Sequence, residues 1–231
     1  MAVRMSEATT ARRNHIVLLG DSIFDNAAYT NGAPDVVTHL RRLLPQSWKA
    51  TSCAVDGATT SGLAAQLSRV PPDSSHLVIA IGGNDALQNS DLLSLRVASS
   101  AEALEVFAER IAIFEGAYRT AITLALALER HTAICTVYNG ALEPERATIA
   151  RVGLALFNDV ILRTAIELRL DALELRSICT EPADYANPIE PSGQGGLKIA
   201  RAISHLVGAV DNAGAPPARV WGNCIDGSCR S

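Results

Sequence analysis

The sequence HIVLLGDSIFDN, residues 15–26, contains an unbroken apolar run that Gly20 stops and a polar loop follows. Short, β-branched-rich runs of this kind are typical of strands buried on both faces of a parallel sheet. Four similar runs follow along the chain, at residues 49–55, 76–81, 133–138 and 171–175. We therefore predict five strands, the first of them formed by residues 15–19.

The stretches between these runs have the apolar spacing of helices. Residues 35–44 place their apolar side chains on one face, and Pro45 ends the pattern. Further helices are predicted at residues 59–67, 99–130 with a bend at Gly116, 145–170 and 192–210. Alternating strands and helices predict an α/β protein, a three-layer α/β/α sandwich around a five-stranded parallel sheet.

Composition and charge restrict the class of protein. The 231 residues are 48% hydrophobic and 19% charged, which favours one folded domain over a disordered chain. We assign it to residues 15–210, with an N-terminal extension at 1–14 and a C-terminal tail at 211–231. The net charge of −4 gives no electrostatic reason to expect nucleic acid or an anionic membrane as a partner.

The expected location is the cytoplasm. The first 14 residues lack the apolar segment of a secretory leader, and no apolar run reaches the ~18 residues of a membrane span. Five irregularly spaced cysteines indicate a reducing environment. Cys224 and Cys229 are spaced as a metal-binding pair, but no second pair or histidine completes a site, so we predict no metal.

Loops of small and polar residues follow each of the first three predicted strands. They contain Gly20-Asp21-Ser22, then Gly57, then Gly82-Gly83-Asn84-Asp85. Because the carboxyl ends of parallel strands meet at one rim, Ser22 is expected to face the Gly57 N–H and the Asn84 side chain. A hydroxyl beside such donors suits acyl transfer. The alternative is that Asp21 or Ser22 merely caps a helix and the other loops are ordinary turns.

The three loops together resemble the motifs of the SGNH hydrolases, which carry a GDSL-type serine motif. The resemblance extends from residue 15 to residue 210, and Ile23 stands where the family usually has leucine. It implies a flavodoxin-like fold and hydrolysis of a small acyl ester or thioester through an acyl-serine at Ser22. It also implies an oxyanion hole made by the Ser22 N–H, the Gly57 N–H and Asn84, with no metal and no cofactor.

The last motif departs from the family pattern Asp-x-x-His. Here Asn187-Pro-Ile-Glu190 leads into the final helix, so Glu190 stands in place of the base histidine and Asn187 in place of its orienting aspartate. His15, His76 and His131 precede strands, at the opposite end of the sheet, and His205 is far along the last helix; His39 is the nearest alternative base. These positions make Glu190 the candidate base.

A Ser22–Glu190 dyad is therefore the first hypothesis. An ordinary glutamate is a weaker base than histidine by roughly 3 kcal/mol of proton affinity, which burial can partly recover. We expect Asn187 to donate an amide N–H to the carboxylate. The alternative hypothesis is an inactive or weakly active binding protein for an acyl or sugar ligand.

Other interpretations have less support from the sequence. No phosphate-binding glycine motif follows the first strand, which disfavours a nucleotide-binding protein. Asp21, Asp25 and Asp85 can meet at one rim and suggest a metal site, although Asp21 and Asp85 also suit the stabilisation of loop turns. Ile23, Phe24 and Tyr29 are expected either to line an acyl pocket or to pack in the core. The oligomeric state is not determined by these patterns.

Overall fold

One parallel sheet organises the computed structural model, which describes residues 14–209. Its strands lie in the order β2-β1-β3-β4-β5. This is the flavodoxin-like order, in which β2 lies on one side of β1 and the later strands are added on the other side. The predicted fold class is therefore confirmed. The predicted tail with Cys224 and Cys229, and the extension before Asn14, lie outside the described residues. The strands are β1 (Asn14–Gly20), β2 (Trp48–Ser52), β3 (His76–Ala80), β4 (His131–Cys135) and β5 (Asp171–Leu173).

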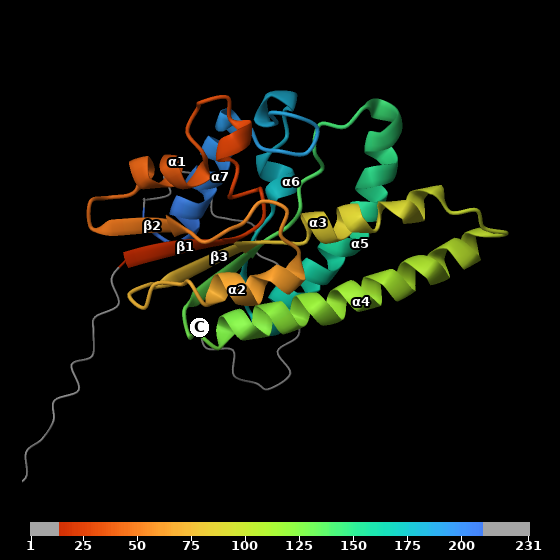
Figure 1. Cartoon of the computed structure of the whole chain (residues 1–231), viewed down its shortest axis with the longest axis horizontal. Coiled ribbons are helices and arrows are strands. Elements are labelled where there is room, and N and C mark those ends of the chain that lie inside the picture. Colours follow the sequence, from red (N-terminus) through yellow and green to blue (C-terminus); the bar gives the residue numbers. More distant parts are fainter. Residues whose placement is uncertain (1–13, 210–231) are drawn as a thin grey trace, which may run out of the picture.

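Helices cover both faces of this sheet, as Figure 1 shows for α1 and α7 on one side and α2 and α4 on the other. Val17 and Leu19 of β1 point into the core beneath α2, α4 and α5, while Ile16 and Leu18 point into the core beneath α1, α6 and α7. The α-helices are α1 (Val36–Leu43), α2 (Leu63–Leu67), α3 (Gly83–Gln88), α4 (Ser100–Leu126), α5 (Pro144–Leu168), α6 (Leu175–Ile178) and α7 (Gly193–Leu206). Short 3-10 helices are η1 (Ala27–Tyr29), η2 (Thr60–Gly62), η3 (Ser90–Ser94) and η4 (Pro182–Asp184).

Element boundaries differ from the predictions in a few places. The helix predicted over 99–130 forms as α4 and runs through Gly116 without interruption. The first turn of the helix predicted at 59–67 is the 3-10 helix η2. α3 was predicted as a loop, because its Gly-Asn-Asp start has low helix propensity and masks the helix that begins directly after Gly82.

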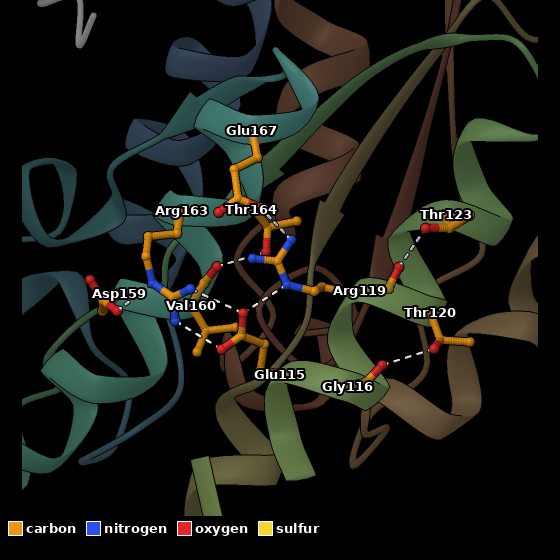
Figure 2. Close-up of polar contacts among 10 residues, drawn as sticks. All are labelled: Glu115, Gly116, Arg119, Thr120, Thr123, Asp159, Val160, Arg163, Thr164 and Glu167. Carbon is orange, nitrogen blue, oxygen red and sulfur yellow. Dashed lines mark hydrogen bonds and ion pairs between the residues drawn. The ribbon is translucent and has the colours of Figure 1, made fainter. Parts of the chain in front are cut away.

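An ion-pair network ties the two long helices α4 and α5 together (Figure 2). The Glu115 carboxylate accepts from Arg119 at 2.8 Å and from both terminal nitrogens of Arg163 at 3.0 and 2.9 Å. Arg119 also contacts Glu167, and Arg163 contacts Asp159. Hydrogen bonds from the two guanidinium groups lower the pKa of Glu115 to about 2.

Glu115→Gln is expected to destabilise the protein by about 1 kcal/mol, because it removes the shared anion of a network and not a single exposed pair. A carboxyl group whose pKa is lowered by folding stabilises the protein at pH values above the ordinary glutamate pKa. This stabilisation is lost as the pH falls toward the pKa of the folded protein. The destabilisation caused by Glu115→Gln should therefore be complete at pH 7 and should disappear as the pH falls from about 4.5 to about 2. Urea unfolding measures it, with Glu105→Gln on the exposed face of α4 as the control. Equal effects of the two substitutions would show that the network contributes nothing.

Candidate active site

A sharp turn after β1 places Ser22 at the carboxyl edge of the sheet. Gly20 has a φ of +132°, and a Cβ there would lie 1.7 Å from the carbonyl oxygen of Ala80, so only glycine fits. The Gln66 side chain of α2 accepts from the Gly20 N–H and donates to its carbonyl, both at 2.7 Å. Sequence reasoning missed Gln66, which looks like any polar residue of an amphipathic helix. These contacts fix the backbone just before the serine.

Hydrogen bonds join the three loops that the sequence placed at one rim. Val55 N–H donates to the Gly20 carbonyl at 3.0 Å, which brings the loop of Gly57 beside the loop of Ser22. The Asn84 amide donates to the Ala58 carbonyl at 2.9 Å. Asp85 accepts from the N–H and the hydroxyl of Thr60 at 3.0 and 2.7 Å. The predicted meeting of the three loops is therefore observed, and Asp85 stabilises a loop.

Two backbone donors at this rim have no partner among the described residues. Neither the Ser22 N–H nor the Gly57 N–H makes a hydrogen bond, and Gly57 is exposed with a φ of +75°. Asn84 donates one of its two amide hydrogens to the Ala58 carbonyl, and this bond orients the side chain. The second amide hydrogen has no partner among the described residues. The rim therefore carries N–H groups that are available to a ligand.

Ser22 and Glu190 are in direct contact. The Ser22 hydroxyl donates to Oε1 of Glu190 at 3.1 Å, and the two residues are 8% and 6% exposed. They are separated by 168 positions in the sequence, so only the fold brings them together. The geometry places a carboxyl group where a proton can pass from the hydroxyl.

The segment that carries Glu190 is held by several backbone contacts. Ala186 N–H donates to the Glu190 carbonyl at 2.8 Å. Asn26 donates to the Pro191 carbonyl at 3.2 Å and accepts from the Val36 N–H at the start of α1 at 3.1 Å. Asn26 is fully buried and was missed as a site residue, because an asparagine after a turn also looks like an ordinary loop residue.

The predicted contact of Asn187 with the Glu190 carboxylate is wrong. Asn187 Oδ1 accepts from the backbone N–H groups of Ile189 and Glu190, both at 2.9 Å, and its amide makes no bond to the Glu190 carboxyl group. An asparagine side chain readily bonds to backbone two or three residues ahead, and that local contact prevails here. Asn187 thus shapes the turn that presents Glu190.

Both buried carboxyl groups of the site have raised pKa values. Burial raises the pKa of Glu190; the hydrogen bond from Ser22 opposes the shift, and the charge of Asp56 adds to it. Burial also raises the pKa of Asp21 to about 7, against the Ile23 N–H bond and with help from the charge of Glu190. One oxygen of each carboxyl group is buried and has no hydrogen-bond partner within residues 14–209. Asp21 also stabilises the turn, as expected, since it accepts from Ile23 at 3.1 Å.

No histidine lines the pocket at Ser22 among the described residues. His15 contacts Asp73 and Thr51 at 3.0 and 2.9 Å, and His76 stacks on His131 with ring centroids 5.1 Å apart. These three lie at the starts of β1, β3 and β4, the opposite end of the sheet. His39 lies in α1 and His205 at the exposed end of α7. The carboxyl group that contacts the Ser22 hydroxyl is that of Glu190.

Ser22 and Glu190 line a pocket of about 160 Å³. Ile23 lines it, whereas Phe24 is fully buried in the core beneath α1 and α7. Tyr29 lies outside the lining, and its hydroxyl donates to Asp56 at 2.7 Å. Within residues 14–209, no three Asp, Glu, His or Cys side chains are grouped to hold a metal ion. The helices of this part of the chain include none long and apolar enough to cross a membrane.

The fold and the three joined loops are those of an SGNH-type hydrolase domain, and solved structures with a similar fold include lipases and esterases. A member of the lipolytic protein G-D-S-L family from Veillonella parvula matches with a TM-score of 0.63 and 15% identity over 85% of this chain and 99% of that chain. Phospholipase A1 from Streptomyces albidoflavus matches with 0.60 and 17% over 82% and 99%. An acetylxylan esterase from Geobacillus stearothermophilus matches with 0.61 and 17% over 84% and 94%. These identities establish the fold alone.

The chain belongs to the GDSL-like lipase/acylhydrolase family, whose model matches residues 18–195. That range includes Ser22, Gly57, Asn84 and Glu190. No curated protein matches the sequence. Family membership supports hydrolysis of ester bonds in general.

Proposed function

We propose that the protein hydrolyses small carboxylic esters or thioesters through Ser22, with Glu190 as the general base. The 3.1 Å hydrogen bond from the serine hydroxyl to a buried carboxyl group is the observation that carries this proposal. A free serine hydroxyl is a weak nucleophile, and an adjacent base activates it. Glu190 supplies that base in place of an imidazole.

The reaction has two steps. Ser22 Oγ attacks the acyl carbonyl carbon while its proton passes to Glu190 Oε1, and the oxyanion is held by the Ser22 and Gly57 N–H groups and by Asn84. The carbonyl reforms as the bond to the leaving alcohol or thiol breaks, and Glu190 returns the proton to that leaving group. Water then attacks the acyl-serine with Glu190 taking its proton, and Ser22 leaves with that proton as the acid is released.

The raised pKa of Glu190 favours this role. A general base works best when its pKa lies near the operating pH, and burial moves the carboxyl group in that direction. Asn187 acts on the backbone and not on the carboxylate, so it does not lower the basicity of Glu190 directly. The chain's own residues supply nucleophile, base and oxyanion donors, so the proposed reaction requires no cofactor.

A serine-directed fluorophosphonate tests the proposal. The probe is expected to label the folded protein at Ser22, located by peptide mass spectrometry, above the level of a heat-denatured sample. Ser22→Ala should lose both the labelling and the cleavage of p-nitrophenyl esters. Labelling no higher than in the denatured sample would favour the alternative, a binding protein for an acyl or sugar ligand.

A further inference from the structure

The pocket at Ser22 brings apolar side chains together with the reacting groups. Leu92 of η3, Phe107 of α4 and Leu154 of α5 line it together with Ser22 and Glu190. Leu92 is 4% exposed. A pocket that combines apolar walls with a nucleophile suits the apolar acyl group of an ester.

The size of the pocket limits the acyl chain. An apolar cavity of about 150 Å³ accommodates benzene, a six-carbon molecule. The pocket here has a volume of about 160 Å³ and is partly open. We propose, on the basis of the function proposed above, that it binds a medium-chain acyl group of roughly six to eight carbons and that the absence of a side chain at Gly153 leaves space for this group.

Gly153 lies inside α5, where glycine is a poor helix former. It lines the pocket, and a Cβ added there would have one neighbour within 4 Å, Leu93 Cδ2 at 4.0 Å. The backbone therefore tolerates a side chain, and that side chain would occupy pocket space. Gly116 in α4 is a matched position, since it is exposed, lies outside the pocket lining and has nothing within 4 Å of an added Cβ.

A series of p-nitrophenyl esters from acetyl to dodecanoyl measures the chain-length preference. Each methylene that becomes buried should raise kcat/KM about fourfold, up to six to eight carbons, after which the increase should stop. Gly153→Leu should lower the ratio of kcat/KM for the octanoyl ester to kcat/KM for the acetyl ester about tenfold or more. Gly116→Leu should keep the wild-type profile. Phe107→Ala should extend the preference to longer chains.

A binding measurement separates this inference from the proposed function. Octanamide, a neutral acyl analogue, should raise the Tm of the wild-type protein and of Gly116→Leu more than that of Gly153→Leu, and acetamide should have no such effect. This pattern without ester turnover would support the pocket and reject the catalytic proposal. Ser22-dependent turnover with a flat profile, unchanged in Gly153→Leu, would reject the pocket and keep the catalytic proposal. The absence of both the octanamide shift and the chain-length preference would also overturn the pocket assignment.

Discussion

Glu190→Gln is expected to lower kcat/KM for ester hydrolysis by about 10³-fold, within the range that removal of a general base produces. Glutamine keeps the size of the side chain and an oxygen that can accept from Ser22 at the 3.1 Å position. It cannot take up the proton that Ser22 must lose. The loss therefore reports proton transfer and not the loss of a contact. Initial rates on a p-nitrophenyl ester measure it.

The pH profile of the wild-type protein should separate this role from a structural one. Glu190 acts in its ionised form, so kcat/KM should rise with pH through the raised pKa of the carboxyl group and then level off. The midpoint should lie above the ordinary glutamate pKa of 4.5. Glu190→Gln should retain the fold, by circular dichroism, and lose this rise. An unchanged rate, or an unchanged rise, in Glu190→Gln would assign the base to another group.

The architecture was predictable because it depends on patterns that repeat along the chain. The buried strands β1, β3 and β4 are short apolar runs, and segments with helical spacing lie between the predicted strands. The topology then places three sequence-distant loops at one rim, which is why Ser22, Gly57 and Asn84 could be grouped before their contacts were seen. Strand order thus carries most of the information about where the site lies.

The contacts that position the site were not predictable in the same way. Gln66 clamps Gly20 through two hydrogen bonds, and Asn26 bridges α1 to Pro191. Neither belongs to a periodic pattern, because a single polar side chain can satisfy many different backbone groups. The same freedom explains why Asn187 binds the backbone and not the carboxylate it was expected to orient.

The carboxyl group of Asp21 should make the stability of the protein depend on pH. Its pKa is about 7 in the folded protein, against 3.8 for an ordinary aspartate, chiefly because burial disfavours the charged form. When folding raises the pKa of a carboxyl group, the protonated group favours the folded protein. This contribution to stability is complete at pH values below the pKa of the unfolded chain, and it is lost as the pH rises toward the pKa of the folded protein. The free energy of unfolding should therefore fall between about pH 4 and pH 7 and then become level.

Asp21→Asn is expected to remove most of this decrease. A shift of about three pH units corresponds to at most about 4 kcal/mol between the two ends of the range, and structural relaxation would reduce it. Asparagine keeps an oxygen for the Ile23 N–H and has no proton to lose. Glu190 contributes a decrease of the same sign, because its pKa is also raised, so a smaller slope should remain in the variant.

Urea unfolding at pH 5 and pH 8 measures the effect as a difference between the two pH values, which cancels any constant cost of burying the new amide. The difference should be large in the wild-type protein, small in Asp21→Asn, and of wild-type size in Asp171→Asn, which changes an exposed carboxyl group of β5. A wild-type slope in Asp21→Asn would show that Asp21 ionises in the folded protein as readily as in the unfolded chain, and the pocket beside Ser22 would then be more polar than its lining indicates.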